Sequence, residues 1–180
     1  MSLFQKNRKK YGVFAALIIL SVVLDQWTKH LAVLHLKGQP SYRLIDGVFH
    51  LSYVENPGAA FGILSRHQWV FWLFSIVGIL ALSVYLFLDR SFLDEKEEAT
   101  GQYPPIPFSV GLCLSAIIGG GIGNMIDRIR LGYVVDFFDF TLIDFAVFNV
   151  ADSFVTVGSV LLIVLLAIPL FQTKKQEKEP

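Results

Sequence analysis

Charged residues and cysteines are both scarce in this chain. Only 17% of the 180 residues are charged, the formal net charge is zero, and Cys113 is the single cysteine. One cysteine excludes an intramolecular disulfide. Cys113 falls inside an apolar run, where packing is its simplest role. We expect no nucleic-acid partner for a chain of this composition.

Patterns that would hold a metal or a phosphate group are missing as well. The glycine-rich stretch at 119–123 (GGGIG) is not followed by the Lys-Ser/Thr of a phosphate loop. We interpret these glycines as places where another helix backbone approaches closely. The histidines lack metal-ligand spacing, and we predict no metal and no organic cofactor. The four histidines are His30, His35, His50 and His67.

Apolar residues, in contrast, make up 54% of the chain, and the mean hydropathy is +0.57. These values are typical of an integral membrane protein. A helix needs roughly 20 residues to cross the hydrocarbon core, and lipid offers no partner for open backbone groups. We therefore predict an all-α polytopic membrane protein with one membrane domain over residues 1–180. The four predicted transmembrane helices cover residues 11–33, 68–88, 108–126 and 147–171.

The basic residues predict how these helices are oriented. Lysines and arginines cluster before the first run and after the last, and such clusters stay on the cytoplasmic side. Both termini and the loop at 89–107 are then cytoplasmic, and the loops at 34–67 and 127–146 face outward. The first apolar run is long and lacks a small-residue cleavage pattern. We expect it to be a retained span rather than a cleaved signal peptide.

The larger outer loop has the pattern of a β-hairpin. Residues 42–54 alternate between apolar and polar on both sides of Asp46-Gly47, a dipeptide suited to a type I′ turn. We predict a small extracytoplasmic hairpin between the first and second helices. Trp69 and Trp72 begin the second helix at the predicted outer interface, where aromatic side chains settle.

The polar residues inside the predicted spans fall in one layer. Asp25 is about 14 residues above the start of the first helix, or roughly 21 Å, which places it in the outer leaflet. The other intramembrane polar residues also lie near the outer ends of their helices, whereas the inner halves are almost purely apolar. The other members of this layer are Asn124, Asp127, Arg128, Asn149 and Asp152.

Several of these residues have simple structural explanations. Asp25 and Lys29 are four residues apart on one helix and can neutralise each other. Asp127 and Arg128 can form an ion pair at the interface. A turn with small residues would explain the Asn56-Pro57-Gly58 segment. We assign these residues supporting roles.

Asp136 and Asp152 are harder to explain by structure alone. Asp136 lies in VVDFFDF and Asp152 in FNVADSFV, and burying a carboxylate among such neighbours is costly. Two close carboxylates share one proton. One can then draw a proton from water while the other donates to a carbonyl oxygen. This is the chemistry of an aspartic peptidase.

Five motifs together resemble a known family. The motifs DQWTK from Asp25, NPGAAF from Asn56, GNMIDR ending at Arg128, VVDF around Asp136 and FNVADS around Asp152 occur in this order. The chain resembles bacterial lipoprotein signal peptidase, also called signal peptidase II, over nearly its whole length. The resemblance implies that Asp136 and Asp152 are the catalytic pair. It also implies substrate-binding or supporting roles for Asp25, Lys29, Asn56, Gly58, Asn124, Asp127, Arg128 and Asn149.

The resemblance further implies an intramembrane aspartic endopeptidase that removes signal peptides from prolipoproteins. Cleavage would fall on the N-terminal side of a diacylglyceryl-modified cysteine. The expected location is the bacterial cytoplasmic (inner) membrane, with the active site toward the outer leaflet. The expected partners are modified prolipoproteins and membrane lipid. We expect a monomer, since four helices are enough to enclose one site.

Other classes of protein also place carboxylates in a membrane. A proton-coupled transporter does so. Its proton pathway would need polar residues in the inner half of the membrane, and such transporters often contain an internal repeat. This sequence shows neither feature. A metal-dependent lipid-modifying transferase would use the aspartates as Mg²⁺ ligands, and a chelator would reveal it. A purely structural subunit leaves the convergence of polar motifs unexplained.

Overall fold

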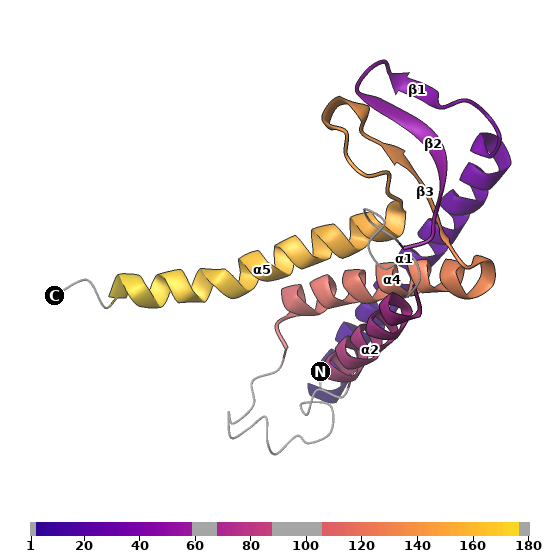
Figure 1. The fold of residues 1–180 in the computed structure, drawn as a ribbon. Helices are drawn as coiled ribbons and strands as arrows, with labels where there is room; N and C mark the ends of the chain where they lie inside the picture. Colours follow the sequence, from indigo (N-terminus) through magenta and orange to yellow (C-terminus); the bar gives the residue numbers. More distant parts are fainter. Residues whose placement is uncertain (1–2, 59–67, 88–105, 177–180) are drawn as a thin grey trace.

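The computed structural model describes residues 3–58, 68–87 and 106–176. It contains long helices and one small antiparallel sheet (Figure 1). The predicted loop at 89–107 and residues 59–67 of the outer loop lie almost entirely outside the described residues. The helices are α1 (Leu3–Leu36), α2 (Gln68–Phe87), α4 (Phe108–Leu131) and α5 (Val150–Gln176). The remaining elements are β1 (Tyr42–Ile45), β2 (Phe49–Asn56), β3 (Val134–Asp139) and the 3-10 helix η3 (Thr141–Ile143).

Three of the described helices are long and apolar enough to cross a membrane. They are found at Lys9–Leu36, Phe108–Leu131 and Val150–Ile168, and a shorter apolar stretch covers Trp72–Phe87. The protein is therefore a mostly helical membrane protein, and the crossing by α2 stays a prediction. The α4 helix continues to Leu131, so residues 127–131 are helical rather than part of the predicted outer loop.

The α4 helix lies at the centre and packs against the other three helices. Its glycines let these neighbours approach closely, as predicted from the sequence. A side chain at Gly120 would overlap the carbonyl oxygen of Ala151 on α5. At Gly119 a Cβ would lie 2.7 Å from the Cβ of Ser21 on α1. The C-terminal part of α5 runs away from the bundle (Figure 1).

The sheet has the strand order β1-β2-β3, with every pair antiparallel. The hairpin of β1 and β2 lies between α1 and α2 in the chain, as expected, but its turn is not type I′. That turn needs positive φ at both central residues, and only Gly47 has it, with φ 68°. The pairing also contains a bulge between Arg43 and Ile45.

The third strand was not expected, because residues 127–146 were predicted to be an outer loop. Val134, Val135, Asp136 and Phe137 of β3 are all buried. A strand buried on both faces lacks the alternating pattern that marks a strand in a sequence. The β3 strand pairs with β2 over Asn56↔Val134 and Val54↔Asp136. This pairing carries Asp136 into the molecule.

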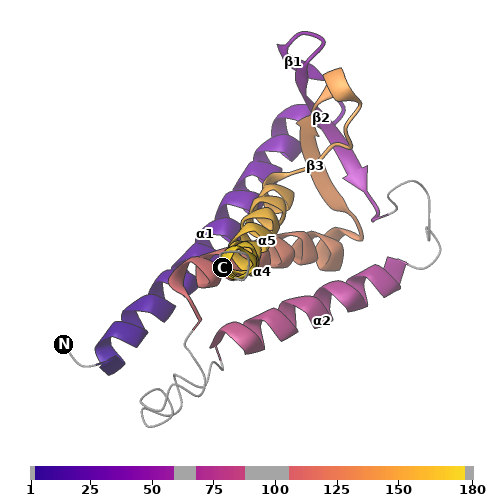
Figure 2. The same cartoon turned by 90° about the vertical axis from the view of Figure 1, so that its left-hand side faces the viewer.

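Two apolar clusters lie on either side of the polar layer. One joins α1, α2 and α4 around Phe14, Leu86 and Ile118. The other packs the sheet against α1 around Ala32, Val135 and Phe137. The sheet therefore lies beyond the C-terminal part of α1, as Figure 2 shows. The polar residues of interest lie where the helices meet the sheet.

Candidate active site

Asp136 is almost completely buried, with 1% of its surface exposed. Its Oδ2 accepts a hydrogen bond from Asn56 Nδ2 at 2.8 Å, and its Oδ1 accepts one from Asn149 Nδ2 at 2.7 Å. Burial raises the pKa of Asp136 to about 6, and the nearby charge of Asp152 acts in the same direction. The two amide donors oppose this rise. Asp136 therefore keeps its proton at a pH where an exposed aspartate has lost it.

Asp152 lies in the first turn of α5 and forms a capping box with Asn149. Asn149 Oδ1 accepts a hydrogen bond from the Asp152 backbone N–H at 2.9 Å, and Asp152 Oδ2 accepts one from the Asn149 backbone N–H at 3.1 Å. Such reciprocal bonds satisfy backbone donors at a helix N-terminus. The other carboxylate oxygen, Oδ1, accepts from Asn124 Nδ2 at 2.7 Å. Asp152 is thus held from both sides while part of its surface stays exposed.

Asn149 contacts both carboxylates and is itself fully buried. Its side-chain amide donates to Asp136, while its backbone N–H donates to Asp152. The same amide nitrogen lies 3.0 Å from Asn124 Oδ1 and 3.3 Å from the Val135 carbonyl oxygen. Asn149 therefore links β3 to the start of α5.

Lys29 connects the remaining polar residues. Its ammonium group lies 2.9 Å from Asp25 Oδ2, 3.0 Å from Asp127 Oδ2 and 2.9 Å from Asn124 Oδ1. The predicted Asp25–Lys29 pair is therefore confirmed. Only 3% of the Lys29 surface is exposed, so its three N–H donors are matched by three buried acceptors. Through Asn124, Lys29 also fixes the amide that holds Asp152.

The predicted ion pair between Asp127 and Arg128 is wrong. Consecutive residues on a helix point about 100° apart, and Asp127 turns toward Lys29 instead. Its carboxylate also accepts hydrogen bonds from Gln26 Nε2 at 2.9 Å and from the Val135 backbone N–H at 3.1 Å. Arg128 is partly buried and lies within the fields of Asp152, Asp136 and Asp127. Among the described residues it makes no direct hydrogen bond or ion pair.

Gln26 and two backbone groups are parts of this network that the sequence did not reveal. Gln26 lies beside Asp25 in the DQWTK motif and also donates to the Gly123 carbonyl oxygen at 3.2 Å. The Ala151 backbone N–H donates to Asp25 Oδ1 at 3.0 Å. The position of Gln26 within that motif was the only available signal. Every residue except proline has a backbone N–H, so the residue type does not show which backbone group will donate to a side chain.

Gly58 orients the amide of Asn56. Its backbone N–H donates to Asn56 Oδ1 at 2.9 Å, and its φ of 86° is a conformation that glycine adopts without strain. With Oδ1 occupied in this way, Nδ2 is directed at Asp136. Residues 59–61 of the same motif lie outside the described residues.

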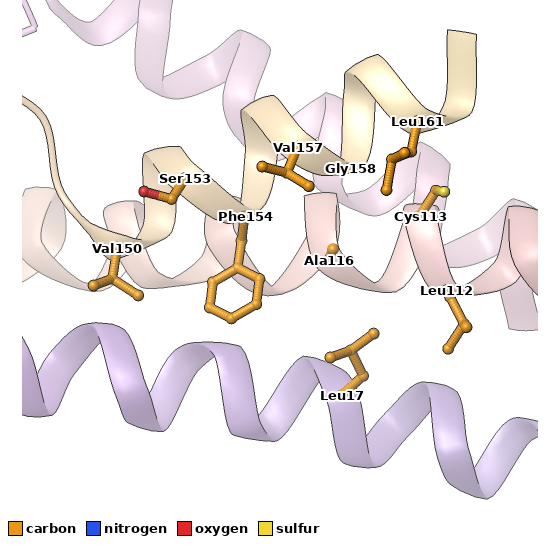
Figure 3. A pocket seen from close by; sticks show the side chains of 10 residues that line it. All are labelled: Leu17, Leu112, Cys113, Ala116, Val150, Ser153, Phe154, Val157, Gly158 and Leu161. Atoms are coloured by element: carbon orange, nitrogen blue, oxygen red, sulfur yellow. The ribbon is translucent and has the colours of Figure 1, made fainter. Parts of the chain in front are cut away.

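Within the described ranges, no group of three or more His, Cys, Asp or Glu side chains is placed to hold a metal ion. A large cavity of about 460 Å³ lies between α1, α4 and α5 (Figure 3). Its α5 wall includes Val150, Ser153, Phe154 and Val157. The lining is mostly apolar, but the Ser153 hydroxyl donates to the Asn149 carbonyl oxygen at 3.0 Å. This end of the cavity therefore borders the polar network.

Apolar helices, with one carboxylate on β3 and one on α5 that both accept from Asn149, define an integral membrane protein whose polar site suits the chemistry of an aspartic peptidase. The sequence model of the family described as Signal peptidase (SPase) II matches residues 17–168. The chain belongs to this family of aspartic peptidases, and it is a membrane protease.

Curated relatives and solved structures agree with this assignment. The lipoprotein signal peptidase of Caldanaerobacter subterraneus subsp. tengcongensis is 44% identical over 149 residues, which are 82% of this chain and 92% of the relative. That of Clostridioides difficile is 43% identical over 150 residues, 83% of this chain and 91% of the relative. A solved bacterial membrane enzyme superposes with a TM-score of 0.72 at 29% identity, covering 94% of each chain.

Proposed function

We propose that this protein removes signal peptides from prolipoproteins by hydrolysing the bond before a diacylglyceryl-modified cysteine. Asp136 and Asp152 are the catalytic residues of this proposal. The observation that carries it is the position of Asn149, which donates to both carboxylates. The names of the relatives support the substrate class. No metal or organic cofactor takes part.

The surroundings of the two aspartates support different roles for them. Asp136 lies among buried apolar residues of β3, where burial raises its pKa to about 6 and favours the protonated form. Asp152 lies at the N-terminus of α5, where the helix dipole and two N–H donors stabilise a negative charge. Asp136 is therefore the acid of the resting enzyme and Asp152 is the base.

Hydrolysis then follows from these two protonation states. Asp152 takes a proton from a water molecule as the water oxygen attacks the carbonyl carbon of the scissile bond. Asp136 donates its proton to the carbonyl oxygen, which gives a neutral tetrahedral intermediate. Asp136, now ionised, takes that proton back, while Asp152 passes its proton to the leaving nitrogen and the C–N bond breaks. Each aspartate ends in its starting state.

The neighbouring polar groups keep the pair in this geometry. Asn56 and Asn149 hold Asp136, and Asn124 holds Asp152. Arg128 lies in the field of both aspartates and is partly exposed. We assign Arg128 to the substrate, whose carbonyl groups need donors in a layer with little water. Lys29 donates to Asn124, and Asp25 and Asp127 hold Lys29 in place.

The setting of the site is also part of the proposal. One membrane domain spans residues 1–180, with four helices crossing the bacterial cytoplasmic membrane and both termini in the cytoplasm. The site then lies toward the outer leaflet, and the sheet covers it from outside. The clusters of lysine and arginine at both ends of the sequence support this orientation. A monomer in contact with membrane lipid is sufficient to form the proposed active site.

The test is cleavage of a diacylglyceryl-modified prolipoprotein by purified protein in detergent with a chelator present. We expect the wild type to cut, and Asp136→Asn and Asp152→Asn to fold but lose at least about 10³-fold in rate. Asp139→Asn is the matched control. It lies on the same strand, but its carboxylate accepts from Ser52 at 2.6 Å, outside the network of Asn149. Its rate should stay near that of wild type.

Three results would overturn the proposal. Retained activity in either variant of the pair would remove that aspartate from the mechanism. A wild-type protein that cuts only without the chelator would point to a metal-dependent enzyme. A protein that never cuts, yet moves protons across vesicles, would be the proton-coupled transporter.

A further inference from the structure

A second polar cluster lies outside the buried network, where α1 meets the sheet. Lys37 follows the last residue of α1, and its ammonium group lies 2.9 Å from Glu55 Oε1 on β2. The Tyr53 hydroxyl donates to the same oxygen at 3.0 Å. The Lys37 ammonium also lies 5.3 Å from the centre of the Tyr53 ring. Tyr133, just before β3, lies close enough to contribute to the lowered pKa of Glu55.

The place of this cluster in the strand pairing links it to the catalytic pair. Glu55 directly precedes Asn56, the donor to Asp136 Oδ2. Glu55 pairs with Val135 in the β2–β3 ladder, one residue from Asp136. The cluster therefore joins the end of α1 to the two strand segments that present Asn56 and Asp136.

Among the ion pairs in the described ranges, only Lys37–Glu55 joins the sheet to a helix end. Arg43 and Asp46 pair within the hairpin, and Lys29 pairs with residues of α1 and α4. Hydrogen bonds from Lys37 and Tyr53 lower the pKa of Glu55, and the contact with Glu55 raises the pKa of Lys37. Both groups are thus charged throughout the neutral range. Surface ion pairs add little to the free energy of folding. We therefore look for the role of this pair in the position of β2 relative to the end of α1.

We propose that the Lys37–Glu55 ion pair, with Tyr53, holds the end of β2 against α1 so that Asn56 keeps its hydrogen bond with Asp136. Lys37 and Glu55 are positioning residues in this proposal, and neither touches the substrate. The inference rests on the proposed function, since it concerns the same catalytic pair. Small displacements of a catalytic group lower the rate of the chemical step while leaving substrate affinity nearly unchanged.

The test compares Glu55→Gln, Lys37→Met and the charge swap Lys37→Glu with Glu55→Lys in full-length protein. Glu55→Gln keeps an acceptor for Tyr53 and removes only the charge. We expect kcat on a diacylglyceryl-modified prolipoprotein to fall about 3- to 10-fold in each single variant. KM should change less than about twofold, and Tm by less than about 2 °C. The charge swap should restore at least about half of the lost kcat, because it restores an attractive pair.

Asp46→Asn is the matched control, since it removes the exposed Arg43–Asp46 pair within the hairpin. Its kcat should equal that of wild type. The proposal fails if kcat of Glu55→Gln is unchanged, or if it falls together with Tm and the charge swap does not restore it. A wild-type protein that does not cut would instead overturn the proposed function.

Discussion

At the residue scale, Asn149 shows how one side chain can serve both structure and chemistry. It caps α5 by accepting from Asp152 N–H, and it donates to Asp136 from the same amide. An N-cap asparagine usually contributes about 1 kcal/mol to helix stability. Here the capping bonds also fix the Asp152 carboxylate relative to β3.

The raised pKa of Asp136 predicts the pH dependence of cleavage. The proposed acid form is present below a pH of about 6 and is lost as the pH rises through this value. We expect kcat/KM to fall about tenfold per pH unit above that point. The fall in kcat should occur at a higher pH, because bound substrate excludes water and raises the pKa further. Rates measured from pH 4 to 9, with Tm recorded at each pH, would check this.

A kcat/KM that stays flat to pH 9 would contradict the assignment of Asp136 as the acid. A fall accompanied by a parallel loss of Tm would report unfolding rather than titration.

Lys29 predicts a large effect on stability. Lys29→Met leaves Asp25 and Asp127 as buried carboxylates without a cation. Losing one partner of a buried pair costs about 3–5 kcal/mol, so we expect a clear fall in Tm in detergent. Adding Asp25→Asn to this variant should recover part of the loss, because it removes one uncompensated charge. Lys9→Met is the control, since Lys9 is exposed near the start of α1.

A Tm of Lys29→Met equal to that of the Lys9→Met control would show that the buried carboxylates find another partner.

At the element scale, the contact between α4 and α5 decides the geometry around Asp152. Gly120 faces the Ala151 carbonyl oxygen, and a Cβ there would also lie 2.8 Å from Val155 Cγ2. Helix backbones that touch in this way tolerate only very small residues. The Asn124–Asp152 hydrogen bond at 2.7 Å crosses the same interface.

Gly120→Ala should therefore push α5 away from α4 and lengthen the Asn124–Asp152 hydrogen bond. We expect a loss of cleavage of more than about tenfold together with a lower Tm. Gly78→Ala on α2 is the matched control, because nothing lies within 4 Å of its added Cβ. Similar rates in the two variants would show that this glycine contact does not position Asp152.

At the scale of the whole molecule, the polar network lies at one end of the apolar helices. It involves the C-terminal parts of α1 and α4 and the N-terminus of α5. The hydrophobic cluster that joins α1, α2 and α4 around Phe14, Leu86 and Ile118 lies away from this network. The polar residues are therefore concentrated toward one end of the molecule.

The predicted orientation can be tested with single cysteines in a Cys113→Ser background. Asp46→Cys, in the exposed hairpin turn, should react with a membrane-impermeant maleimide in intact spheroplasts. Lys9→Cys should react only after lysis, because basic segments stay cytoplasmic. Labelling of Lys9→Cys in intact spheroplasts would reverse the assignment. The unmodified Cys113→Ser protein is the blank for both measurements.

The family and the membrane setting could be predicted from the sequence because their signals are local. Long apolar runs indicate that the helices lie in lipid rather than in water. The Asp25–Lys29 pair follows from a spacing of four residues on one helix. The five motifs that carry the resemblance are short and continuous. The glycine stretch at 119–123 was also interpreted as a helix contact, and the structure agrees.

Only the tertiary structure decided which distant groups meet. Lys29 and Asp127 are 98 positions apart in the chain, and their pairing depends on how α1 crosses α4. The β3 strand forms because β2 lies beside it, and its buried sequence has no alternation to reveal it. Local spacing reports which face of a helix a residue occupies. It does not report which residues of a second helix or strand will contact that face.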